Sequence, residues 1–229
     1  MSQSRPTIHL GESNERLYLR DHTFQMPNGE QVIAHKFEGD ASVIDRHIGR
    51  YQFGIPQIQN GDTVGDFPCG SGYASDVLPP GITYEGFDID PYTLEYARQM
   101  YGSTNRKFSL GDLRAPNLES GKYNVFFCVE GIEHIERKFH QSLVEALHES
   151  LVFEGVLIIT SPEAKVTGPA EHNEYHLCEY ALPDFRTLLE NVFVPGGGNV
   201  EITTTRRVKM TTGNFTRMLL ATCHRGAKN

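Results

Sequence analysis

A short apolar run leads into a glycine-rich turn at Val64-Gly65-Asp66-Phe67-Pro68-Cys69-Gly70-Ser71-Gly72-Tyr73. Thr63–Phe67 has the pattern of a short strand, and Tyr73–Leu78 has that of a helical stretch. Glycines between a strand and a helix let a ligand approach the backbone closely, and open α/β sheets bind their ligands at the carboxyl ends of the strands. We therefore predict a ligand site at this turn.

The turn lacks two common phosphate-binding patterns. A dinucleotide site is expected to show G-x-G-x-x-G, but Ser75 stands where the last glycine would follow Gly70 and Gly72. The lysine of a P-loop is absent as well. A nicotinamide dehydrogenase is therefore the weakest of the enzyme classes that we consider.

Strands and helices alternate beyond the turn. Further strands are predicted at Tyr84–Ile89, Lys107–Leu110, Tyr123–Val129 and Gly155–Thr160, and helices at Ala41–Ile58 (residues 41–58), Pro91–Tyr101, Phe139–Leu151 and Leu182–Asn191. This alternation predicts an α/β fold with a mostly parallel sheet and helices on both faces. Two β-rich runs, Val200–Val208 and Asn214–Cys223, flank Met210–Gly213 and predict an antiparallel C-terminal hairpin, which brings the sheet to seven strands.

Acidic residues follow the second and third strands. Asp88 lies 22 residues after Asp66, about the spacing at which such sheets place the acid that binds ribose hydroxyls. Asp112 ends the next strand, where a carboxylate can accept from an exocyclic amine while the following backbone N–H donates to a ring nitrogen. A helix cap or turn is the alternative role for one such acid. Three consecutive strand ends finished by Gly or Asp favour a nucleoside-containing ligand.

Together these segments resemble the class I S-adenosylmethionine-dependent methyltransferase family. The resemblance is carried by Val64–Tyr73, Glu85–Asp90, Gly111-Asp112, Phe127–Ile135, Phe153–Pro162 and Asn173–Tyr180, in the family's order and spacing. It implies a Rossmann-like methyltransferase domain over 46–229, preceded by an extension over 1–45 that is expected to cover the acceptor site together with Glu163–Tyr180. Pro68 departs from the usual Gly or Ala, and Phe153-Glu154-Gly155 departs from the usual Pro-Gly-Gly turn.

The resemblance also implies S-adenosylmethionine as the cofactor and assigns residues to it. The methionine end is expected at Asp66 and the backbone of Pro68, Cys69, Gly70 and Gly72, the ribose at Asp88 and Ile89, the adenine at Asp112 and Leu113, the carboxylate at Arg50 and Tyr51, and the region of the reactive group at Glu130. For Arg50, a solvated helix residue is the alternative interpretation.

Glu130-x-x-Glu133-His134 follows the fourth strand and is expected beside the reactive sulfonium. A hydroxyl acceptor needs its proton removed or weakened, so His134, with Glu130, is a candidate for base catalysis. Alternatively Glu130, Glu133, His134 and His176 hold a divalent metal, Mg²⁺ or Mn²⁺, which lowers the pKa of the hydroxyl. Metal-dependent small RNA 2′-O-methyltransferases and quinone-biosynthesis O-methyltransferases show the same pattern, as do relatives with no known metal. A purely structural role, with acids at a helix start, is the third interpretation.

Composition limits the function further. The chain has 229 residues, suited to one domain, and 21 basic against 29 acidic residues give it a net charge of −8. It has neither an apolar run of about 20 residues nor an N-terminal signal-peptide pattern, so we expect no membrane partner and a cytoplasmic location. Its four cysteines form no CxxC pair and are expected to be reduced thiols.

The acidic balance disfavours nucleic acid as a partner but does not exclude it, since residues 201–229 hold six basic residues and one acid. The sequence thus predicts an S-adenosylmethionine-dependent methyltransferase acting on a small or medium-sized acceptor through oxygen. One alternative is a metal-dependent RNA 2′-O-methyltransferase, and another is a non-catalytic cofactor-binding partner subunit. Nothing in the pattern specifies an oligomeric state.

Overall fold

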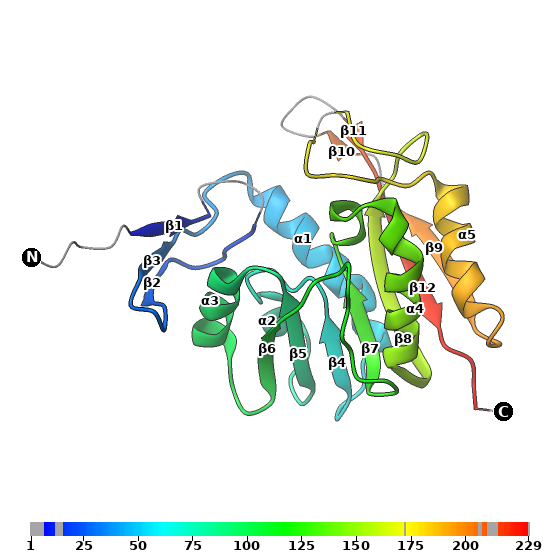
Figure 1. The fold of residues 1–229 in the computed structure, drawn as a ribbon, viewed down its shortest axis with the longest axis horizontal. Coiled ribbons are helices and arrows are strands. Elements are labelled where there is room, and N and C mark those ends of the chain that lie inside the picture. The colour runs from blue at the N-terminus through cyan, green and yellow to red at the C-terminus, as the bar shows by residue number, and fades with distance from the viewer. Residues whose placement is uncertain (1–6, 12–15, 172, 206–207, 210–214, 229) are drawn as a thin grey trace, which may run out of the picture.

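The computed structural model describes residues 7–11, 16–171, 173–205, 208–209 and 215–228. Within these residues the chain folds around a seven-stranded sheet in the order β6-β5-β4-β7-β8-β12-β9 (Figure 1). The strands are β4 (Thr63–Asp66), β5 (Thr83–Asp88), β6 (Arg106–Leu110), β7 (Tyr123–Cys128), β8 (Leu151–Pro162), β9 (Asn199–Thr204) and β12 (Met218–His224). Only β12 runs against its neighbours, pairing antiparallel with β8 and with β9. The predicted fold class is confirmed.

Helices cover both faces of the sheet (Figure 1). They are α1 (Ala41–Gly54), α2 (Ala74–Val77), α3 (Pro91–Tyr101), α4 (His140–Ser150) and α5 (Leu182–Phe193). Because successive strand residues point to opposite faces, Val125 and Phe127 of β7 join the core beneath α1 to α3, while Phe126 and Cys128 join the core beneath α4 and α5. This is the strand buried on both faces that the apolar run predicted.

The described N-terminal residues form a separate three-stranded sheet in the order β1-β3-β2. Its strands are β1 (Ile8–Leu10), β2 (His22–Gln25) and β3 (Gln31–Ala34), and a tight turn over Met26–Glu30 joins β2 to β3. No local pattern in the sequence indicates this sheet, because β1 pairs with β3 through contacts between distant residues. Tyr96 of α3 donates from its hydroxyl to the carbonyl of Arg20, so this small sheet rests on the half of the molecule that contains α3. The predicted domain boundary at residue 45 lies inside α1.

Several element bounds differ from those predicted. Helix α1 ends at Gly54 and continues as a 3-10 turn over Ile55–Gln57, since Pro56 cannot donate a helical hydrogen bond. Strand β8 is longer than the predicted Gly155–Thr160, and α2 has only four residues. Two further 3-10 turns, Ile132–His134 and Arg137–Phe139, lie between β7 and α4.

The C-terminal hairpin is present, although its predicted turn at Met210–Gly213 lies outside the described residues. Before and after that turn, β10 (Val208–Lys209) pairs antiparallel with β11 (Phe215–Thr216). All four cysteines are buried free thiols. Among the described helices, none combines the length and the apolar character that crossing a membrane requires.

Candidate active site

The glycine-rich turn leaves β4 at the carboxyl edge of the sheet, as predicted. Gly70 has a φ of +52°, and a Cβ there would meet no other described atom within 4 Å. Gly72 has a φ of +81°, but a Cβ there would lie 2.7 Å from Phe108 and 2.8 Å from Ala97. The turn therefore needs Gly72 for packing, whereas Gly70 presents bare backbone to open space, where a ligand can approach it closely.

Asp66 lies beneath this turn and is fully buried. Its carboxylate accepts hydrogen bonds from the hydroxyls of Tyr84, at 2.6 Å, and Tyr51, at 3.2 Å. Burial raises the pKa of Asp66 to about 8, and the two hydroxyls only partly oppose this shift. Because both oxygens already have donors, a direct contact between Asp66 and the methionine end stays a prediction.

Asp88 ends β5 beside the turn and is 1% exposed. It accepts from the backbone N–H of Gly70 at 2.9 Å, which joins the turn to the predicted ribose-binding acid. The next residue, Ile89, is 51% exposed and offers an apolar surface at the same edge. Asp112, at the end of the following strand, is held by Arg114 through hydrogen bonds of 2.6 to 3.1 Å. Leu113 is buried.

Arg50 projects from α1 into the interior and is buried beside Glu130. The Nε of Arg50 lies 3.3 Å from Oε1 of Glu130, close enough for an ion pair but not aligned as a hydrogen bond. Among the described residues, neither Nε nor Nη1 of Arg50 has a hydrogen-bond partner. A buried guanidinium with unused donors is a good fit for a carboxylate ligand such as the methionine end of the cofactor. The alternative of a solvated helix residue is wrong.

Three of the four predicted metal ligands come together. The ligand atoms of Glu133, His134 and His176 all lie within 4.8 Å of one another. Glu133 is fully buried, and neither of its carboxylate oxygens has a hydrogen-bond partner among the described residues. Burial, with a contribution from the Glu130 charge, raises the pKa of Glu133 well above its usual range. Glu130 is outside this group; its backbone takes a φ of +53° and its side chain pairs with Arg50.

Both histidines of this group are oriented through Nδ1. His134 Nδ1 lies 3.0 Å from the carbonyl oxygen of Tyr175, and His176 Nδ1 lies 2.6 Å from Oε1 of Glu179. Hydrogen bonds at Nδ1 leave Nε2 of each ring as the atom for a metal, an arrangement that is usual for metal-binding histidines. Burial and the neighbouring His176 lower the pKa of His134, which favours the neutral ring that coordination needs. The donor set therefore fits a divalent cation.

The sequence analysis missed several residues around this site. Glu179 orients His176, and its spacing of three residues from that histidine was the available signal. Tyr84 holds Asp66, and Arg16 pairs with Asp88 at 2.8 Å; neither contact has a local sequence signal. His47 lies one turn before Arg50 on α1, and burial, with the Arg50 charge, lowers the pKa of His47 to about 4.

The fold is similar to that of several solved structures. The YcgJ protein of Bacillus subtilis superposes with a TM-score of 0.62 at 11% identity, over 80% of this chain and all of that one. An S-adenosylmethionine-dependent methyltransferase of Methanosarcina mazei has a TM-score of 0.58 at 13% identity, over 76% of this chain and 96% of that one. The [4+2]-cyclase SpnF has a TM-score of 0.62 at 12% identity, over 84% of this chain and 87% of that one, so the fold alone does not specify the reaction.

Sequence comparison matches the central part of the chain to one family model. No curated protein matches the sequence of the chain. Residues 64–155, which run from β4 into β8 and include the turn, Asp88, Asp112 and the Glu130–His134 segment, match the family model described as a methyltransferase domain. With the predicted fold and motifs in place at the carboxyl edge, residues 64–155 are similar to the methyltransferase domain of S-adenosylmethionine-dependent enzymes.

Proposed function

We propose that the chain is an O-methyltransferase that activates a hydroxyl of a small or medium-sized acceptor with a divalent metal held by Glu133, His134 and His176. The observation that supports this proposal is the buried carboxylate of Glu133, which has no hydrogen-bond donor among the described residues and lies within 4.8 Å of two imidazoles. Leaving a buried carboxylate unpaired costs free energy, and a bound cation would offset this cost.

The site supports a division of work among its residues. The Gly70 backbone would hold the methionine end of the cofactor, Asp88 its ribose, and Arg50 its carboxylate. A metal bound at the three ligands would orient the acceptor and lower the pKa of its hydroxyl. S-adenosylmethionine would supply the methyl group, which would pass from sulfur to the acceptor oxygen, with the hydroxyl proton lost to solvent and S-adenosylhomocysteine released.

The ligand set favours Mn²⁺ over Mg²⁺ as the first ion to test. Mg²⁺ prefers oxygen ligands and keeps several waters, whereas two imidazole nitrogens with one carboxylate suit Mn²⁺ and the later transition metals better. An RNA 2′-hydroxyl would use the same chemistry. Single-stranded RNA is therefore included among the acceptors, although the net charge of −8 favours a small molecule.

Methyl transfer from labelled S-adenosylmethionine to a panel of hydroxyl acceptors and short RNAs tests the proposal. We expect a chelator to abolish turnover and added Mn²⁺ to restore it. His134→Ala and His176→Ala should each lower turnover by about a hundredfold or more while S-adenosylhomocysteine binds as before. His224→Ala is the matched control, because His224 pairs with Val156, six residues before the carboxyl end of β8.

Each rival interpretation has its own outcome. Turnover that resists the chelator but is lost in His134→Ala would contradict activation by a metal and favour His134 as a general base. The role of Glu130 beside such a base would then be tested by Glu130→Gln. Tight S-adenosylhomocysteine binding without transfer to any acceptor would favour the partner subunit. Salt-sensitive transfer to RNA alone would replace the small acceptor by a 2′-hydroxyl.

A further inference from the structure

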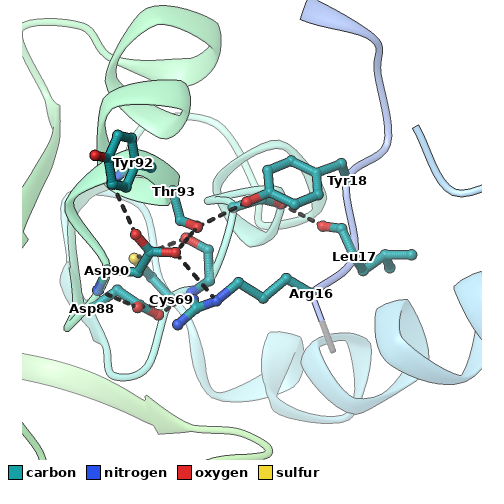
Figure 2. A network of polar contacts seen from close by, with 10 residues as sticks. Arg16, Leu17, Tyr18, Cys69, Asp88, Asp90, Tyr92 and Thr93 are labelled. Atoms are coloured by element: carbon teal, nitrogen blue, oxygen red, sulfur yellow. Dashed lines mark hydrogen bonds and ion pairs between the residues drawn. The ribbon is translucent and has the colours of Figure 1, made fainter. Parts of the chain in front are cut away.

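A segment from the N-terminal region lies across the predicted ribose site, as Figure 2 shows. We call this segment, Arg16–Arg20, the strap. The carbonyl oxygen of Leu17 accepts from Oγ of Ser71 in the glycine-rich turn at 2.5 Å, and the hydroxyl of Tyr18 bonds with that of Thr93 on α3 at 2.8 Å. The strap is thus fixed to the turn on one side and to α3 on the other.

Arg16 of the strap closes over the Asp88 carboxylate. Its Nη1 donates to Oδ1 of Asp88 at 2.8 Å. The other donors that the described residues supply to this carboxylate are backbone groups, the N–H of Gly70 on Oδ2 at 2.9 Å and the N–H of Asp90 on Oδ1 at 3.0 Å. With these three donors in place, Asp88 is 1% exposed.

Arg16 is the donor that can leave. The two backbone donors are part of the turn and of the start of α3, whereas the Arg16 side chain is 31% exposed and has a path to solvent. Asp90 lies 3.7 Å from the Nε of Arg16, so a guanidinium that releases Asp88 keeps a second carboxylate nearby. The ion pair with Asp88 is therefore reversible without leaving the arginine unpaired.

We propose that Arg16 occupies the place of the cofactor's ribose on Asp88, so that the strap competes with the cofactor and is displaced when it binds. Ribose hydroxyls need acceptor positions on a carboxylate that Arg16 now covers, and each binding event must break a charged hydrogen bond. Affinity is lowered by the fraction of molecules in which the strap is closed. This inference rests on the assignment of Asp88 to the ribose and needs neither the metal nor the acceptor.

Calorimetry with S-adenosylhomocysteine, using the full chain in chelator, tests the proposal. Arg16→Ala should bind about tenfold more tightly than the wild type, because a hydrogen bond to a charged group no longer has to be broken. Arg20→Ala is the matched control, since Arg20 lies on the same strap but pairs with Asp76 at 3.0 Å. That control should change the affinity by no more than about twofold, as is usual for exposed ion pairs.

Trypsin cleavage after Arg16 in the wild type provides a second readout that does not depend on a variant's folding. S-adenosylhomocysteine should accelerate this cleavage, because it frees the strap. Weaker or unchanged binding by Arg16→Ala, or protection of Arg16 by the ligand, would overturn the competition. A wild type that fails to bind S-adenosylhomocysteine would overturn the Asp88 assignment and this proposal with it, whereas chelator-resistant methyl transfer would contradict only the proposed metal.

Discussion

The buried Arg50 and the half-buried Glu130 form a pair in which the arginine keeps unused donors. The Nε and Nη1 atoms of Arg50 lack hydrogen-bond partners among the described residues, although Glu130 lies at ion-pair distance. A pair arranged in this way can accept a second carboxylate without first losing a well-formed hydrogen bond. Arg50 is therefore suited to distinguish ligands that carry the methionine carboxylate from those that lack it.

Substitution of Arg50 tests this discrimination. Arg50→Gln should weaken S-adenosylhomocysteine binding by about thirtyfold or more, as expected for the loss of a buried charge partner. It should leave the binding of 5′-methylthioadenosine, which has no carboxylate, nearly unchanged. Arg46→Gln, one turn earlier on α1, is the control, because Arg46 bonds to Ser42. Equal losses for both ligands, measured by calorimetry, would contradict a carboxylate contact.

Asp66 makes stability depend on pH with a defined sign. The folded chain holds its proton up to a pKa of about 8, whereas a carboxyl in an unfolded chain titrates near pH 4. Between these values the folded state binds the extra proton, so the free energy of unfolding falls as the pH rises, by up to about 1.4 kcal/mol per pH unit. Asp66→Asn removes this dependence. The free energy of unfolding of Asp66→Asn, relative to that of the wild type, should therefore be higher at pH 8 than at pH 5 when both are measured by urea unfolding. The same difference between variant and wild type at the two pH values would contradict a raised pKa of Asp66.

The long strand β8 contains, near its start, a residue in an unfavourable conformation. Glu154 is exposed and has a φ of +62°. The family that this chain resembles usually has the first glycine of a Pro-Gly-Gly turn at this position. Glu154→Gly should therefore raise the free energy of unfolding by about 0.5–1 kcal/mol, because glycine adopts this conformation without a Cβ clash. Glu154→Ala keeps the clash and should show no such gain in urea unfolding. A loss of stability in the glycine variant would mean that the side chain of Glu154 makes a favourable contact.

Helices and strands with strong local sequence signals were predictable. Where an element ends depended in several cases on the strands that pair with it. Helix α3 begins and ends where predicted, at Pro91 and Tyr101, because proline at the first turn and apolar residues at helical spacing define it locally. Strand β8 extends to Leu151–Pro162 because pairing with β7 and β12 continues beyond its apolar centre. The parallel pairing of β1 with β3 joins residues more than 20 positions apart, so periodicity could not predict it.

At the scale of the whole molecule, the site also contains residues that local motifs predict and contacts that only the tertiary structure shows. The turn, Asp88 and the Glu133-His134 pair lie within short motifs, and the sequence places them at the correct sheet edge. Arg16 reaches Asp88 from 72 residues away, and Tyr84 reaches Asp66 from the adjacent strand β5. The first contact depends on how the N-terminal region packs on the large sheet, and the second depends on the pairing of β4 with β5. Motifs therefore predict which groups carry the chemistry, and tertiary packing determines which of them are free to use it.

Metal binding should be visible in the stability of the whole chain, without cofactor or acceptor. A ligand at about 100 times its Kd stabilises the folded state by about 2.7 kcal/mol, and for a domain of this size each kcal/mol raises Tm by about 2–4 °C. Mn²⁺ added to chelator-treated protein should then raise Tm by about 5–10 °C in the wild type and in His224→Ala. His176→Ala should show little of this shift, because it removes one of three convergent ligands while Glu133 stays buried. Calorimetry measures these Tm values. A rise in Tm for His176→Ala equal to that of the wild type would mean that the ion binds elsewhere and that the buried Glu133 lacks its proposed partner.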